Sequence, residues 1–180
     1  MNSKFLVVRF NWDNVPELEV LTGTEWLAYR YSHGKPIKAT APLLRFSAGG
    51  ELLDFIIFGL LIMVSEKVRM VISRYGADVQ FVPVEIERDG NKLNYCILNV
   101  LHLCDCLDLA ASGAVIKYGI IFSFERLCLV EDRVDDVPAF LLPENGQHAI
   151  FLRRDVVDEL QRVGCTGVSF IPPEECRMGM

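Results

Sequence analysis

The chain has 180 residues, of which 51% are hydrophobic and 23% are charged. This composition excludes a disordered chain, and a protein of this length can form a core without disulfide bonds. The formal net charge is -6, which suits phosphate backbones poorly, so no nucleic-acid partner is expected. We expect a single α+β domain over residues 1–180, with an N-terminal part over residues 1–50 and a core over residues 51–176.

The N-terminal part begins with a predicted strand at Phe5–Phe10. Its apolar run is interrupted at Arg9 and is too short for a secretory signal. The most apolar segment, Phe55–Val64, is also far shorter than the roughly 20 residues that cross a bilayer, so we interpret it as a buried strand region. The sequence therefore predicts a cytoplasmic protein with no membrane contact, whose cysteines are reduced.

An amphipathic helix is predicted after this segment. Its apolar residues follow the i, i+3, i+4, i+7 spacing of a helix that buries one face, at Val68, Val71, Ile72 and Tyr75. Ser65 stands where a side-chain oxygen can accept from a free amide of the first turn. Gly76 stands where the chain has to turn left-handed to leave the helix.

The same pattern returns near the C-terminus. Residues 62–85 align with residues 150–174 when one gap is placed opposite Gly167. Seven aligned pairs are then identical, namely Ile62/Ile150, Val68/Val156, Arg74/Arg162, Gly76/Gly164, Phe81/Phe170, Pro83/Pro172 and Glu85/Glu174. In the second copy Arg153 replaces the capping serine, and we expect Asp155 to cap the helix or to favour its dipole.

The repeat predicts an α+β fold with two related strand–helix–strand units, antiparallel hairpins and a mixed sheet. A strand follows each helix, at Val79–Ile86 and at Val168–Ile171. Pro83 and Pro172 accompany these strands, and a proline cannot donate a hydrogen bond to a ladder. We therefore expect both strands to lie at sheet edges or to carry bulges.

Turn signals divide the rest of the chain. Asp89-Gly90 predicts a hairpin between Phe81–Glu87 and Lys92–Leu98. Two further strands within residues 113–130 are predicted to separate near Tyr118-Gly119. A turn is expected at residues 144–146.

The most metal-like stretch is His102-Leu103-Cys104-Asp105-Cys106. The spacing of its two cysteines is tighter than that of structural zinc ligands, and no second ligand pair follows. We therefore expect no metal and no cofactor, and we interpret Cys104 and Cys106 as small buried thiols.

A nucleophilic pair remains an alternative, because such pairs are made in space. It would join Cys104 or Cys106 to His102, His33 or His148. No local signature of a thiol or serine hydrolase surrounds these residues, and the chain has no phosphate-binding glycine loop. A protein that is not an enzyme is the favoured interpretation.

Four carboxylates gather in the loop EDRVDD, at Glu131, Asp132, Asp135 and Asp136. Acidic residues that are adjacent on a loop are commonly only solvated. The sharper interpretation is a patch that docks a basic protein partner, with fast and salt-sensitive association.

Three segments resemble a known family. They are VSEKVRMVISRYGADVQFVPVEI, NYCILNVLHLCDCLDL and FLRRDVVDELQRVGCTGVSFIP, within about residues 50–173. Their Val-Ser-Glu helix start, Phe-x-Pro-Val strand, Leu-Asn-Val with a following Asp-Leu, and closing Gly-x-x-Phe strand are similar to an immunity protein family of bacterial polymorphic toxin systems. This family is of myxobacterial type and was formerly a domain of unknown function. Arg153 departs from the family's usual serine.

The resemblance implies a protein that binds a cognate toxin and neutralises it in the cytoplasm, without catalysis and without a cofactor. It carries over no functional residues, so the four carboxylates of the EDRVDD loop are candidate contacts on charge alone. Two alternatives are kept. One is a thiol-dependent hydrolase, and the other is an adaptor that binds peptides along an edge strand.

Overall fold

The structure is a computed structural model that describes residues 3–11, 16–21, 34–37, 44–144 and 149–177. In this part of the chain, strands dominate and form a six-stranded, a four-stranded and a two-stranded sheet. The six-stranded sheet is mixed, because one of its strand pairs is parallel. These features confirm the predicted α+β class. No helix among the described residues is long and apolar enough to cross a membrane.

The first predicted unit forms one side of the six-stranded sheet. It comprises β4 (Phe55–Phe58), β5 (Leu61–Ser65), α1 (Glu66–Arg74), β6 (Val79–Arg88) and β7 (Asn91–Val100). The strand order is β4-β5-β7-β6, and every neighbouring pair in this part is antiparallel. The apolar segment interpreted as a buried strand region is thus a hairpin of two strands.

The second unit forms the four-stranded sheet. It comprises β10 (Ala139–Phe140), β11 (Phe151–Arg153), α3 (Arg154–Arg162), β12 (Val168–Ile171) and the N-terminal strand β1 (Phe5–Phe10). The strand order is β10-β11-β1-β12, again antiparallel throughout. In each unit a helix connects two strands that are not neighbours in the sheet, because one further strand lies between them. The helix α1 connects β5 to β6 with β7 between them, and α3 connects β11 to β12 with β1 between them.

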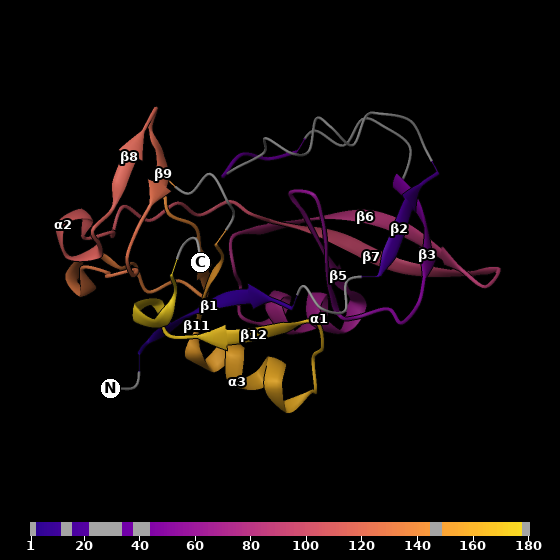
Figure 1. Ribbon diagram of the computed structural model, residues 1–180. Coiled ribbons are helices and arrows are strands. Elements are labelled where there is room, and N and C mark those ends of the chain that lie inside the picture. The colour runs from indigo at the N-terminus through magenta and orange to yellow at the C-terminus, as the bar shows by residue number, and fades with distance from the viewer. Residues whose placement is uncertain (1–2, 12–15, 22–33, 38–43, 145–148, 178–180) are drawn as a thin grey trace.

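The remaining elements extend these two sheets. Strands β2 (Glu17–Val20) and β3 (Leu44–Gly49) complete the six-stranded sheet beside β6. A short helix α2 (Leu109–Ser112) precedes β8 (Val115–Lys117) and β9 (Ile120–Ser123), which pair only with each other. Figure 1 shows this β8–β9 hairpin at the end of the molecule opposite to the tip of β6 and β7.

The two units pack together through their helices, which lie next to each other in Figure 1. The central cluster joins both helices and one face of each sheet, and it includes Val71, Ile72, Val157 and Leu160. The hydroxyl of Tyr75 on the first unit donates to the carbonyl oxygen of Asp155 on the second, at 3.0 Å. The alternation of β1 follows from this arrangement, because Leu6 and Val8 enter the central cluster while Phe5 and Val7 enter a second cluster on the opposite face.

The helix ends form as the sequence predicts. The Ser65 hydroxyl accepts from the amide of Val68 at 3.5 Å, and Gly76 leaves α1 with φ 67°. At α3, Arg153 makes no capping bond, and the carboxylate of Asp155 accepts from the amide of Val156 at 2.9 Å. Asp155 thus supports the start of the second helix, as expected.

Gly167, the residue opposite the gap in the repeat, lies where the two units meet. Its backbone has φ 92°, and an added Cβ would lie 2.3 Å from the carbonyl oxygen of Phe55. Its own carbonyl accepts from the amide of Asn11 at the end of β1, at 3.1 Å. The extra residue therefore lets the loop before β12 lie directly against β4 of the first unit.

The expectation of edge strands is right for β12 and wrong for β6. β12 is an edge strand of the four-stranded sheet and Pro172 follows its last residue, but β6 lies between β3 and β7 in unbroken register. The amide of Leu101 on the β7 side donates to the carbonyl of Asp78. Residues of an antiparallel pair alternate between bonding to the partner strand and pointing away from it, so the nitrogen of Pro83, five residues after Asp78, points away from β7. Among the described residues, the pairing of β6 with β3 begins at the next residue, Val84, so no described ladder bond is lost at Pro83.

Candidate functional site

The loop at residues 131–136 is an exposed segment held by backbone bonds. Glu131–Arg133 forms a short 3-10 helix, and all four carboxylate residues of the loop are exposed. The amide of Val130 donates to the carbonyl of Cys106 at 2.7 Å, and the Cys104 thiol donates to the carbonyl of Arg133 at 3.3 Å. The carboxylates are therefore presented from a fixed backbone.

Two of the four carboxylates already have partners. Asp135 lies 2.8 Å from Nε2 of His102, and Asp136 lies 3.1 Å from Lys4 and 3.5 Å from Arg153. The hydrogen bond from Lys4 holds the pKa of the Asp136 carboxyl below its usual value. Of the loop's four carboxylates, Glu131 and Asp132 are therefore the two without an ion pair among the described residues.

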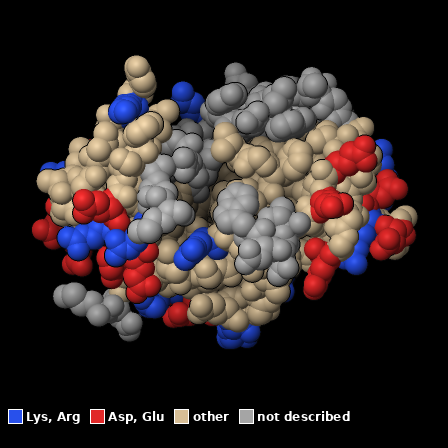
Figure 2. Space-filling view, viewed as in Figure 1, with Lys and Arg blue, Asp and Glu red and all other residues tan. Residues whose placement is uncertain are grey.

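Charges of both signs lie on the described surface in Figure 2. Figure 2 shows acidic and basic side chains interspersed at both ends of the face it presents. At one end of the six-stranded sheet, Arg45 pairs with Glu85 and Glu87, and Lys92 also pairs with Glu85. Steering of a basic partner would therefore be local, because screening limits such an effect to about 10 Å.

The fold separates the histidine of the metal-like stretch from its two cysteines. His102 faces Asp135 at the surface, whereas Cys104 and Cys106 are buried in the cluster below the loop. Among the described residues, no group of three or more His, Cys, Asp and Glu side chains is placed to hold a metal ion.

Two of the thiols have the opposite character to that of catalytic nucleophiles. Burial raises the pKa of the Cys106 thiol well above its usual value, and the neighbouring thiol of Cys104 adds to this shift. Burial also raises the pKa of Cys165 to about 11. These thiols stay protonated at neutral pH, while a thiol nucleophile has to ionise. His33 and His148, the other candidate bases, lie outside the described residues.

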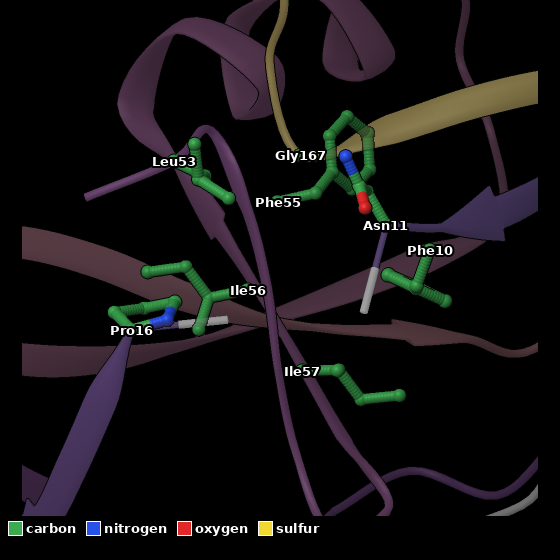
Figure 3. Close-up of a pocket in the computed structure, with 8 residues that line it drawn as sticks. All are labelled: Phe10, Asn11, Pro16, Leu53, Phe55, Ile56, Ile57 and Gly167. Carbon is green, nitrogen blue, oxygen red and sulfur yellow. The ribbon is translucent and has the colours of Figure 1, made fainter. Parts of the chain in front are cut away.

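A small pocket opens where β1, β4 and the loop before β12 meet. It encloses about 180 Å³ together with the solvent space at its mouth, and its lining includes Phe10, Phe55, Ile56 and Gly167. Figure 3 shows that these side chains are mainly apolar, with Asn11 the polar side chain among those drawn. Because this volume also counts open solvent, the enclosed space is far smaller than the roughly 300–1,000 Å³ that is typical of ligand sites.

The sequence interpretation missed the side chains that the β8–β9 hairpin exposes. Val115, Tyr118, Ile120 and Phe122 are exposed apolar side chains on this hairpin. The residue types predicted strands, and a strand pattern does not reveal that one face remains uncovered. An aromatic residue in a two-residue turn was the available signal, because packing seldom reaches such a position.

The comparison with known protein families gives one match. A sequence model described as the immunity protein family Imm11 matches residues 34–175. The matched segment contains the first unit, the EDRVDD loop and the β8–β9 hairpin, but it begins after β1 and β2. No curated protein matches the chain. Because the match covers most of its length, the chain belongs to the Imm11 immunity protein family.

Proposed function

We propose that this protein binds a cognate bacterial toxin in the cytoplasm and neutralises it by covering the toxin's active surface. Membership of an immunity protein family is the observation that carries this proposal. The described surface supports binding rather than chemistry, because its accessible features are an acidic loop and an apolar hairpin. An interface of about 1,600 Å², the standard size of specific complexes, would suffice.

The EDRVDD loop is proposed as one part of this interface. Glu131 and Asp132 are exposed and extend the loop's charge toward solvent, so a toxin with a basic surface would be steered toward them. Asp135 and Asp136 stabilise the loop through His102 and Lys4 and contribute less free charge.

Growth rescue tests the function itself. The proteins encoded on either side of this gene are expressed in a sensitive host, alone and together with this chain. We expect one of them to stop growth alone and to be harmless when this chain is present. If none is toxic, or if the toxicity persists during co-expression, the proposed function is wrong.

Charge reversal tests the loop. The double substitution Glu131→Lys with Asp132→Lys should lower the association rate with the toxin by about tenfold at low salt, with a smaller change at high salt. Glu17→Lys with Glu19→Lys is the matched control, because both residues are exposed on the distant strand β2 and the net charge changes equally. Association rates are measured by stopped flow over a range of salt concentrations. Equal rates for both double variants would remove the loop from the interface.

The edge-strand alternative has less support. β12 is an edge strand of only four residues, and short edges offer few bonds to an added peptide. A partner held by backbone bonds would also bind with little dependence on salt, which separates it from a partner steered by the loop.

A further inference from the structure

The β8–β9 hairpin is anchored at its base and apolar at its surface. Ile121 is buried in the cluster beneath it, and the amide of Ile121 donates to the carbonyl of Glu144 at 2.8 Å. The side chains of Val115, Tyr118 and Phe122 face solvent. Figure 1 shows the hairpin projecting from the body of the molecule. A fixed base with an exposed apolar tip is suited to insertion into a partner.

The turn of this hairpin has an unusual residue at its first central position. Tyr118 and Gly119 have φ 55° and 76°, which are the positive values that a two-residue type I′ turn requires at both central positions. Asp89 and Gly90 close the β6–β7 hairpin with nearly the same values, 51° and 75°. Asp tolerates this conformation at little cost, whereas a bulky aromatic residue is strained there.

Packing does not offset this strain in the free protein. The side chain of Tyr118 is fully exposed, at 102% of its reference area, and Phe122 is 61% exposed. The folded chain therefore gains nothing from an aromatic ring at the turn. Strain that no contact offsets is typical of residues with a function in binding or catalysis.

The chemistry of the tip matches that of an interface centre. The ammonium group of Lys117 lies 3.8 Å from the centroid of the Phe122 ring. Lys117 is the only charged residue between Val115 and Ser123, so the tip is apolar and positive although the whole chain has a net charge of -6. Aromatic residues beside a cation are enriched among the residues that dominate binding energy.

The exposed area indicates which occupant fits. Tyr118 and Phe122 together offer roughly 300 Å², judged from the 150–250 Å² that an aromatic side chain buries. A stable complex needs about 800 Å² per partner. Two hairpins that meet tip to tip would fall short of this area. A concave partner that surrounds the tip and continues onto the neighbouring surface would reach it.

We propose that the β8–β9 tip is the anchor of the complex and inserts into an apolar cleft of the toxin that carries carboxylates to receive Lys117. This inference rests on the proposed function and names the part of the chain that enters the partner. The EDRVDD loop would form part of the rim. Val134 of that loop and Ile116 of the hairpin pack on the same buried cluster, so one core supports both surfaces.

The substitution Tyr118→Asn separates binding from folding. Asn is favoured at this turn position, so the variant should be as stable as the wild type or more stable. Its affinity for the toxin domain that the wild type neutralises should fall by about 30-fold or more. Leu93→Ser is the matched control, because it removes an exposed apolar side chain from the other hairpin and should change affinity by less than about twofold. Calorimetry gives the affinity, and urea unfolding gives the stability.

The outcomes separate this inference from the proposed function. If the wild type binds and protects while Tyr118→Asn binds equally well, the anchor is overturned and the function stands. If the wild type protects against no toxin encoded beside its gene, both the proposed function and the proposed role of the β8–β9 tip are wrong. If sedimentation shows that the wild type is a dimer that Tyr118→Asn dissociates, a second copy occupies the hairpin and the toxin-cleft proposal is overturned.

Discussion

A chain shortened to residues 34–175, the segment that the family matches, is expected to lose cooperative unfolding. The cut removes β1, which lies between β11 and β12 and pairs with both of them. Four consecutive β1 residues are almost fully buried, at Phe5, Leu6, Val7 and Val8. Without them the four-stranded sheet loses the strand between β11 and β12, and both of its faces lose buried apolar side chains.

A single substitution gives the same test with less disruption. Phe5 packs edge-on against Phe140 with centroids 5.1 Å apart, and Phe140 stacks on Phe151 at 4.7 Å. Phe5→Ala should therefore lower the free energy of unfolding by about 3–5 kcal/mol. Phe122→Ala is the control and should cost less than about 1 kcal/mol, because Phe122 is largely exposed. If urea unfolding of the shortened chain shows the wild-type midpoint, β1 is dispensable and this account of the second unit is wrong.

Replacing Asp54 should have the second large effect, because its carboxylate joins the two units. It accepts from the Ser65 hydroxyl at 2.7 Å and from both the amide and the hydroxyl of Thr166 at 3.0 Å. Lys67 adds an ion pair at 2.7 Å. Asp54→Ala removes the acceptor of the Ser65 hydroxyl and of Thr166, and we expect a loss of about 2–4 kcal/mol in the free energy of unfolding.

The same carboxylate makes stability depend on acidity. Burial alone raises the pKa of Asp54, but hydrogen bonds from Lys67, Ser65 and Thr166 outweigh it and hold the pKa below its usual value. A carboxyl with a lowered folded-state pKa stabilises the fold above its unfolded-state pKa of about 4, and this stability is lost as the pH falls through the folded-state value. The contribution of Asp54 is therefore complete at neutral pH, begins to decline near pH 4 and is lost as the pH falls through the lower folded-state pKa.

Unfolding at several pH values tests this linkage. Asp54→Asn should be less stable than the wild type at pH 7, and the difference should shrink as the pH falls below about 4. Asp158→Asn is the matched control for the loss of one carboxylate, because Asp158 is exposed on α3. A difference between Asp54→Asn and the wild type that stays constant from pH 7 to pH 3 would contradict the assigned role.

Local patterns determined the parts of the fold that could be predicted. The stripe from Val68 to Tyr75 and the signals at Ser65, Gly76 and Asp89-Gly90 depend on neighbours within a few residues, and the structure confirms each of them. The place of β1 could not be predicted in this way. Its partners Arg153 and Ile171 lie more than a hundred residues away, and no pattern within Phe5–Phe10 indicates which strands it pairs with.

Long-range pairing also explains the wrong expectation at Pro83. The pattern of β6 gave no sign that β3, from the N-terminal part, would pair beside it and make it an internal strand.

The ion pairs of the candidate site could not be predicted either, because they also depend on residues far away in the sequence. The sequence shows four acidic residues in one loop, but the partners of Asp136, Lys4 and Arg153, come from two other strands or their ends.

Stoichiometry is the most direct test of neutralisation by binding. The purified toxin domain is titrated with the purified wild-type chain, its activity is followed, and the mass of both chains is measured afterwards. The account predicts that inhibition rises linearly, is complete at one molar equivalent, and leaves both masses unchanged. Inactivation by a small fraction of an equivalent, with a change in the mass of the toxin, would instead show an enzyme and contradict the account.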